Sequence, residues 1–304
     1  MNSYSKSVTI GIATYNRSKF LVQTVKSILS QNCDFNLEII IVDQTPDVQV
    51  TNNLNVFFQD LDKNIRYFVQ QRPAVSLARN TIISLSKGDV ILFFDDDVIL
   101  GENCIASHLS VYENHNVKSC IGHIHHRKFS FELDLLDIKN PRNGTDSIMD
   151  EDAILDLNYK GVSISCNQSF DKNVLLQIGG FDENFIGGYY EDADIGLRYK
   201  REGYQIAFHP NAMVLHLRAP QGGLRFESSQ PFTEVERLIS FVLFYVRYPK
   251  EYGFRKSMWT ILRAGPLRKS NILNPFKHFY SWINLFIAFK ISFKIKNKVK
   301  SILL

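Results

Sequence analysis

The chain has 304 residues, of which 45% are hydrophobic and 22% are charged. This length allows one large α/β domain or two small ones with a sizeable buried core, and the composition is that of an ordinary globular protein. Disordered, collagen-like and coiled-coil classes are therefore excluded. The cysteines Cys33, Cys104, Cys120 and Cys166 are far apart. Their spacing predicts reduced core thiols, with neither a disulfide framework nor a zinc site.

Charge sets the C-terminal segment apart from the rest of the chain. The net charge is +4, yet residues 252–304 hold eleven Lys or Arg and no Asp or Glu, so residues 1–251 carry −7. Basic segments bind phosphate-rich surfaces, and the Phe, Ile, Leu and Trp of this one favour anionic lipid over nucleic acid. The first ten residues lack the basic-then-apolar pattern of a signal peptide, and the sequence has no uncharged apolar run of 18 residues. We therefore expect a cytoplasmic protein, peripheral to the inner face of a membrane.

Four aromatic residues near the C-terminus recur at helical spacing. Trp282, Phe286, Phe289 and Phe293 would share one face of a helix, with lysines on the adjoining face. This pattern predicts a helix that lies on a bilayer. The alternative is a helix whose aromatic face packs on the rest of the chain or on a second copy, which leaves a homo-oligomer open.

The first hundred residues read as consecutive βαβ units, which predict a parallel sheet covered by helices. The expected strands are Val8–Ala13, Glu38–Val42, Ile65–Val69 and Asp89–Phe94, and the expected helices cover Phe20–Leu29 and Ala74–Ser86. In open α/β sheets, ligands bind beyond the carboxyl ends of the strands. The polar residues at those ends are Thr14, Tyr15, Asn16, Arg17, Asp43, Asp95, Asp96 and Asp97.

The periodicity is weaker after Gly101, although several elements can still be predicted. The expected order is a helix at Asn103–His115, a strand at Ser119–His125, a polar insert at Lys128–Lys160, a strand at Gly161–Cys166, helices at Lys172–Ile178 and Glu191–Glu202, and a strand at Ala212–Leu217. A helical region follows from about Phe232.

Three consecutive carboxylates, Asp95, Asp96 and Asp97, come directly after an apolar strand. Their mutual repulsion raises the cost of folding unless a cation is present, and hard oxygen ligands suit Mg²⁺ or Mn²⁺. An acidic turn that caps the next helix is the alternative. The sequence has neither a G-x-G-x-x-G motif after the first strand nor a P-loop, so a nucleotide held through a metal fits better than either phosphate cradle.

A second acidic cluster, Glu191, Asp192 and Asp194, opens a predicted helix behind a glycine-rich turn. A carboxylate there can act as a general base, whereas the alternative is simple capping of the helix N-terminus. Arg218 and Arg225 lie in a basic, glycine-containing stretch that either closes over a diphosphate or forms a solvated linker.

The histidines His123, His125 and His126 alternate along a predicted strand. A lone strand offers poor metal geometry, so we expect them to be partly buried or at the surface.

Taken together, these residues resemble a known family. The segments that carry the resemblance are Val8–Arg17, Ile41–Asp43, Ala78–Asn80, Gly88–Asp97, Gly179–Glu183 and Glu191–Asp194. Their order and spacing are similar to those of the family 2 inverting glycosyltransferases with the GT-A fold, over about residues 7–217. The resemblance implies a Rossmann-like, mixed and mostly parallel sheet flanked by helices, with a helical C-terminal extension.

The resemblance also implies roles for individual residues. Nucleotide-binding roles fall on Thr14, Tyr15, Asn16, Arg17, Asp43, Arg79, Asp95 and Asp96. Asp95, Asp97 and His216 would bind Mn²⁺ or Mg²⁺, Asp192 would be the catalytic base, and Glu191, Arg218 and Arg225 would face the acceptor or the diphosphate. Residues 1–220 would form the transferase domain, with a nucleotide-binding half (1–100) and an acceptor half (101–220), followed by a basic helical region (221–304).

The activity implied by the resemblance is metal-dependent, inverting transfer of a sugar from a nucleoside-diphosphate donor, expected to be UDP-linked, to a saccharide or lipid-linked acceptor in surface polysaccharide synthesis. Two departures from the family pattern are Ala13, where Pro is common, and Lys172, where Arg is common. The same acids would also suit a metal-dependent nucleotidyltransferase or phosphohydrolase. A non-catalytic sugar-nucleotide-binding module is a further alternative.

Overall fold

A mixed β-sheet forms the centre of the computed structural model, which describes residues 7–32, 36–114, 116–127, 145–147, 154–161, 163–186, 188–224 and 234–302. The strands are β1 (Val8–Thr14), β2 (Leu37–Asp43), β3 (Ile65–Val69), β4 (Val90–Asp95), β5 (Val98–Leu100), β6 (Val117–Arg127), β7 (Thr145–Ser147), β8 (Asn167–Asp171) and β9 (Gln205–His216). Their order is β3-β2-β1-β4-β8-β6-β9-β5, with β7 paired to β6. On this path β8 and β5 run opposite to the other strands, whose carboxyl ends therefore meet at one edge.

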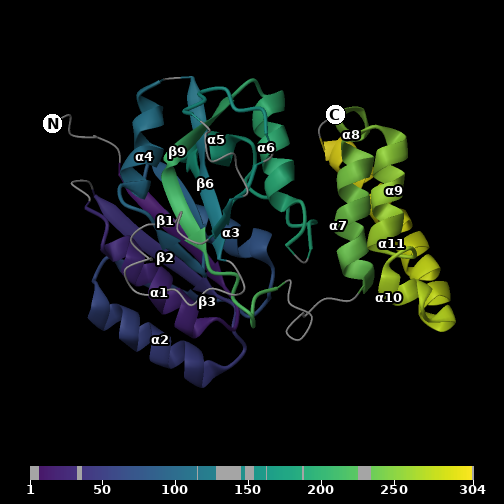
Figure 1. Cartoon of the computed structure of the whole chain (residues 1–304), viewed down its shortest axis with the longest axis horizontal. Coiled ribbons are helices and arrows are strands. Elements are labelled where there is room, and N and C mark those ends of the chain that lie inside the picture. The colour runs from purple at the N-terminus through teal and green to yellow at the C-terminus, as the bar shows by residue number, and fades with distance from the viewer. Residues whose placement is uncertain are drawn as a thin grey trace.

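Helices cover both faces of the sheet (Figure 1). They are α1 (Ser18–Leu29), α2 (Val48–Leu61), α3 (Val75–Leu85), α4 (Cys104–Ser110), α5 (Lys172–Gln177) and α6 (Glu191–Arg201), with a 3₁₀ turn at Val111–Glu113. Side chains of α1, α2 and α4 pack on one face, and those of α3, α5 and α6 pack on the other. Strand β4 supplies Leu92 to the first core and Phe93 to the second, which explains its continuous apolar sequence.

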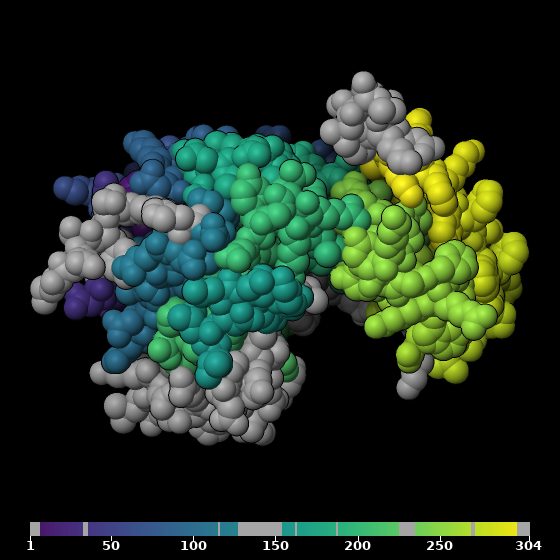
Figure 2. All heavy atoms as spheres, turned by 90° about the horizontal axis from the view of Figure 1, so that it is seen from above, coloured from purple at the N-terminus to yellow at the C-terminus, as the bar shows by residue number. Residues whose placement is uncertain are grey.

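The C-terminal helices form a lobe beside the sheet (Figures 1 and 2). They are α7 (Glu234–Arg247), α8 (Pro249–Tyr252), α9 (Phe254–Ala264), α10 (Lys269–Ile272) and α11 (Pro275–Ile302). Helix α7 packs along α11 through Leu238 and Leu285. The other side of α7 contacts the segment before α6, where the ring of Phe244 stacks on Tyr190 with centroids 4.4 Å apart. Helix α7 therefore joins the lobe to the sheet through this contact.

Most of the predicted elements are confirmed, and β3 matches its predicted bounds. The strand predicted at Gly161–Cys166 is wrong, because the strand in this region is β8, Asn167–Asp171. Its first residues are polar yet fully buried. The Asn167 amide donates to the carbonyls of His123 and Ala212, and Gln168 Nε2 donates to Ser119 Oγ. Buried polar residues with satisfied hydrogen bonds do not produce the apolar signal on which the prediction rested.

The short strand β5 fixes the turn that holds the three aspartates. It reverses the chain directly after Asp97 and pairs with the end of β9. The hydroxyl of Thr24 on α1 accepts from Val98 N–H at 3.1 Å and contacts the carbonyl oxygens of Asp96 and Val98 at 3.0 and 2.8 Å. This turn therefore places the aspartates beside β9. The predicted polar insert, Lys128–Lys160, lies mostly outside the described residues.

Helix α11 departs from the single aromatic face predicted for it. Trp282, Phe286 and Phe293 are exposed, whereas Phe289 is partly buried and packs against the α7 side of the lobe. Exposed apolar residues also extend toward the start of α11, where Phe276 and Phe279 are 78% and 64% exposed. Within the described residues, no helix has the length and apolar composition needed to cross a membrane.

Candidate functional site

A cavity of about 370 Å³ opens where the carboxyl ends of β1, β2, β4, β6 and β9 converge. Its lining comprises Ala13, Thr14, Tyr15, Arg17, Gln44, Val75, Arg79, Asp95, Asp96, His126, Gly188, Glu191, His216, Gly223 and Leu224. Segments separated by more than two hundred residues thus meet at one edge of the sheet. This edge is the position at which open α/β sheets bind ligands.

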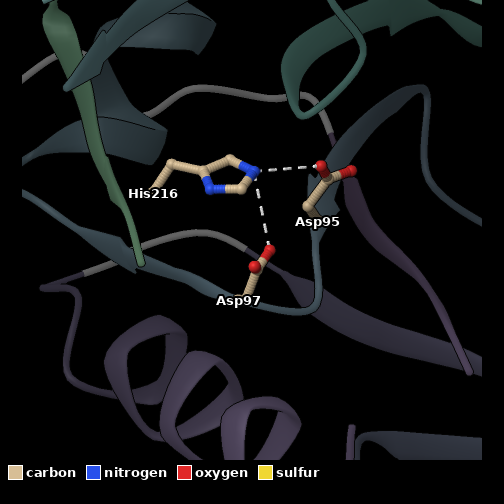
Figure 3. Close-up of side chains that lie close together, drawn as sticks. All are labelled: Asp95, Asp97 and His216. Atoms are coloured by element: carbon tan, nitrogen blue, oxygen red, sulfur yellow. Dashed lines mark ion pairs between the residues drawn. The ribbon is translucent and has the colours of Figure 1, made fainter. Parts of the chain in front are cut away.

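Asp95, Asp97 and His216 form a group that could hold a metal ion (Figure 3). His216 Nε2 lies 3.5 Å from Asp95 Oδ2 and 3.6 Å from Asp97 Oδ1. One ligand atom from each residue lies within 4.8 Å of the others. Asp97 Oδ1 is buried and has no hydrogen-bond partner among the described residues. A buried carboxylate oxygen without a donor is costly, so the donor set fits a cation placed between these three residues.

The protonation of His216 reflects the carboxylates around it. Burial alone would lower the pKa of His216. The hydrogen bond to Asp95 and the charges of Asp97 and Asp95 outweigh burial and raise that pKa above its usual value. The carboxylates of Asp95 and Asp97 thus favour the positively charged form of the imidazole.

Arg17 neutralises the other side of the aspartate turn. Its Nη1 lies 2.9 Å from Asp96 Oδ1 and 3.3 Å from Asp97 Oδ2. Asp96 also accepts a 2.6 Å hydrogen bond from the Thr14 hydroxyl. Burial raises the pKa of Asp96 to about 7, although Arg17 and the Thr14 hydrogen bond act in the opposite direction. Asp96 therefore orients Arg17 and Thr14 at the cavity, while Asp95 and Asp97 face His216.

Arg79 connects the aspartate turn to the second acidic cluster. It extends from α3, with Nη1 3.2 Å from Glu191 Oε1 and Nη2 3.8 Å from Asp95 Oδ1. Its guanidinium lies 5.1 Å from the ring centre of Phe181, and its side chain is 6% exposed. A buried arginine held on both sides has a fixed direction, so Arg79 presents a rigid positive charge to the cavity.

The three acidic residues at the start of α6 differ in burial and in their contacts. Glu191 is buried and lines the cavity, whereas Asp192 is half-buried and does not line it. Asp192 Oδ1 accepts the N–H of Ala193. Asp194 is fully buried and binds Arg198 and Arg247. Of the three acids, Asp192 is thus the one that is not buried.

The segment after β9 folds over the end of β1. Gly223 N–H donates to Tyr15 O at 2.8 Å, and Arg17 Nε donates to Gln221 O at 3.2 Å. Gly222 has a φ of 72°, and a Cβ there would lie 2.3 Å from Asn16 O, so glycine is required. Arg218 is exposed and does not line the cavity. The remaining loop residue predicted for the site, Arg225, lies outside the described residues.

Two of the predicted nucleotide-binding residues, Asp43 and Asn16, do not line the cavity. Asp43 is buried, where it accepts hydrogen bonds from the Tyr67 hydroxyl and from Thr45 N–H. Asn16 is exposed, and its N–H donates to Thr45 Oγ1. Both stabilise the loops after β1 and β2, and neither lines the cavity.

Two residues that do line the cavity, Gln44 and His126, were not predicted to belong to the site. Gln44 follows Asp43, so its position at a strand end could have identified it. The ring centre of His126 lies 5.3 Å from that of His216, because β6 runs parallel to β9 and pairs these residues in register. That pairing joins distant strands and leaves no local sequence signal.

Comparison with known proteins agrees with this geometry. The family model described as glycosyl transferase family 2 matches residues 9–175, more than half of the chain. The chain is similar to YfnE, a glycosyltransferase of Bacillus subtilis strain 168, with 22% identity over 254 residues, covering 69% of this chain and 64% of YfnE. It is also similar to chondroitin synthase of Escherichia coli, with 24% identity over 242 residues, covering 70% of this chain and 35% of that enzyme.

Among solved structures, GalNAc-T7 with UDP, GalNAc and Mn²⁺ matches with a TM-score of 0.57 and 14% identity, over 85% of this chain and 48% of that one. This likeness confirms the predicted GT-A type of α/β fold. The chain spans less than two thirds of the length of each of these relatives.

Proposed function

The chain belongs to glycosyl transferase family 2, and on this premise we propose that it transfers a sugar from a nucleoside diphosphate to a hydroxyl of a carbohydrate or lipid-linked acceptor. The observation that carries the proposal is the group Asp95, Asp97 and His216 at a cavity between strand ends. Arg17 and Arg79 add two fixed positive charges to the same cavity. Such a site suits the diphosphate of a nucleotide sugar.

We propose UDP as the nucleotide carrier, and the UDP in the GalNAc-T7 structure supports this choice. The nucleoside would lie toward Thr14, Tyr15 and Gln44, and the diphosphate toward Arg17 and Arg79. Residues 1–220 would form the transferase domain, whose first hundred residues provide most of these contacts.

Asp95, Asp97 and His216 would hold Mn²⁺ or Mg²⁺, and the Mn²⁺ in the GalNAc-T7 structure supports a divalent cation. When bound, the cation would neutralise the charge that develops on the departing diphosphate. Arg79 would contribute to the same neutralisation, because its contacts with Glu191 and Asp95 keep the guanidinium at the cavity.

Asp192 would act as the base that removes the proton of the acceptor hydroxyl. It lies in the first turn of α6, immediately after cavity-lining Glu191. Glu191 is held by Arg79 and is therefore the poorer candidate. A single displacement assisted by this base would invert the configuration at the anomeric carbon, and no protein nucleophile would be required.

Product analysis tests the proposed reaction. The chain is incubated with UDP-sugars, Mn²⁺ and candidate saccharide acceptors, and products are identified by NMR. We expect free UDP and a glycoside of inverted anomeric configuration. A sugar phosphate would instead indicate phosphohydrolase or nucleotidyltransferase chemistry. A glycoside of retained configuration would refute single displacement, and UDP-sugar binding without turnover would indicate a binding module.

We further propose that the C-terminal lobe binds an anionic membrane surface, which would place the protein at the inner face of a membrane near a lipid-linked acceptor. The outer side of α11 exposes a broad apolar surface, including Phe276 and Phe286. The opposite side of α11 is also apolar and packs on α7. Helix α11 is therefore apolar on both sides, and α7 covers only one of them. The exposed lysines Lys277, Lys290 and Lys294 flank this surface. Each basic residue near anionic lipid contributes about 1 kcal/mol of binding.

Vesicle sedimentation of the full chain tests this membrane proposal. We expect binding to phosphatidylglycerol vesicles at low salt, weaker binding at high salt, and at least roughly tenfold weaker binding of F276S/F286S, since two aromatic anchors are lost. The control V48S/V56S removes two exposed apolar residues of α2 and should bind as the wild type does. Equal binding of both double variants would contradict the proposal.

A further inference from the structure

A second cavity, of about 200 Å³, lies between α7, α9 and the segment before α6. Three arginines, Arg237, Arg263 and Arg268, line it together with Tyr189 and Phe241. No acidic residue lines the described part of this cavity. We call it the arginine cavity. Guanidinium groups that line one small cavity repel one another, so this arrangement favours a bound anion.

The surroundings of Arg237 and Arg263 also favour an anion in the arginine cavity. Arg237 Nε is buried and has no hydrogen-bond partner among the described residues. Burying a charged donor without a partner is costly, and an anion in the arginine cavity would remove that cost. The guanidinium of Arg263 lies 5.9 Å from the ring centre of Trp259, a contact that restricts its direction without neutralising its charge.

The arginine cavity lies next to the proposed catalytic base. Gly188 and Glu191 line the first cavity, whereas Tyr189 lines the arginine cavity. The two cavities therefore share the segment 188–191 as a wall, and Asp192 follows this wall directly. A ligand seated among the arginines would lie where this segment faces α7 and α9, while the donor diphosphate would lie where it faces the first cavity.

We propose that the arginine cavity binds a phosphate group of the acceptor, so that a phosphate-linked saccharide is the substrate class of this site. This inference rests on the proposed function. Phosphate fits better than carboxylate, because its oxygens point in several directions and can be shared by several guanidinium groups. The acceptor phosphate would anchor the substrate while a sugar hydroxyl reaches Asp192.

Calorimetric titration of the full chain with glycerol phosphate tests the proposal, with UDP and Mn²⁺ present at saturation to occupy the first cavity. We expect saturable binding that weakens by at least roughly tenfold in R237Q/R263Q, since each charged hydrogen bond to phosphate contributes about that factor. R237K/R263K should recover part of the affinity. The matched control R255Q removes one exposed charge of α9 outside the cavity and should bind within about twofold of wild type.

Two results would overturn the proposal. One is the absence of saturable glycerol phosphate binding, and the other is equal affinity in R237Q/R263Q and R255Q. A binding assay with phosphatidylglycerol vesicles distinguishes two possible occupants of the arginine cavity, an acceptor phosphate and a lipid headgroup. If R237Q/R263Q loses vesicle binding but keeps glycerol phosphate binding, the occupant is the headgroup and the proposal is wrong. A separate titration of UDP into the same proteins, with Mn²⁺ and without glycerol phosphate, reports on the first cavity alone. Failure of the proposed function is therefore distinguishable from failure of this proposal.

Discussion

Replacing Arg247 by Met should loosen the contact between the helical lobe and the helix that bears the proposed base. Arg247 Nη1 lies 2.7 Å from Asp194 Oδ1, and Nη2 lies 2.7 Å from Asp182 Oδ2. Its guanidinium also lies 5.2 Å from the ring centre of Phe185. Asp194 is fully buried and keeps Arg198 and the Tyr248 hydroxyl as partners when Arg247 is removed. Asp182 loses its cation altogether within the described residues.

These contacts set the expected loss in the free energy of unfolding of R247M. Removing one partner of a buried ion pair costs about 3–5 kcal/mol, and the partners that Asp194 retains place the expected loss near the lower end, at about 3 kcal/mol. That corresponds to a fall in Tm of roughly 5 °C for a chain of this size. The control E251Q removes the acid of the exposed Arg201–Glu251 pair, which also joins α6 to the lobe, and should cost less than about 1 kcal/mol.

The pH dependence of this loss has a definite sign. Burial raises the pKa of Asp182, but Arg247 and the hydrogen bonds from Asn184 outweigh burial and lower it below its usual range. A lowered pKa stabilises the folded state above the ordinary carboxylate pKa of about 4, and this stabilisation is lost as the pH falls through the lowered value. Urea unfolding of wild type and R247M should therefore differ most near neutral pH and converge in acid. A difference no larger than that of E251Q, or one that grows in acid, would refute the reasoning.

Four further changes test the first cavity. D97N should abolish the dependence of UDP binding on Mn²⁺ while the fold survives, and equal UDP affinity with and without EDTA in the wild type would exclude a metal. D192N should keep UDP binding but slow transfer by roughly 10²-fold or more; normal turnover would shift the base to Glu191. G222A should weaken UDP binding, because its Cβ would meet Asn16 O and displace the loop from Arg17. Mn²⁺-dependent UDP binding should fall as the pH drops through the raised pKa of His216, since a protonated imidazole cannot bind a metal, and H216Q should remove this dependence.

The elements that could be predicted from the sequence are those whose pattern of apolar residues lies within one continuous segment. Strands β1 to β4 are apolar runs separated by helical periods, and their polar ends follow directly in sequence. Thr14, Arg17 and the three aspartates could therefore be placed without a structure, whereas Gln44 was missed. Strand β8 could not be placed, because its buried amides are satisfied by partners from other strands. Hydrophobic periodicity reports burial of apolar side chains only.

The unpredicted part of the two cavities depends on long-range pairing. His126 reaches the first cavity only because β6 and β9 are parallel neighbours, an order that the sequence does not encode locally. Arg237 and Arg263 meet in the arginine cavity because α7 and α9 pack together. Each of these arginines, taken alone in sequence, looks like an ordinary basic residue on a helix. Only their convergence distinguishes a binding site from a solvated surface.

The start of α6 is where the sheet and the lobe depend on one another. Tyr190 caps this helix with a φ of 68°, a left-handed conformation that costs a non-glycine residue roughly 1 kcal/mol. The stacking of Tyr190 on Phe244 of α7 offsets that cost, and Arg247 holds Asp194 one turn further along. The proposed donor contacts come mainly from β1, α3 and β4, which pack within the sheet layers. Loosening the lobe should therefore lower kcat, through the base on α6, more than it raises the KM of the donor.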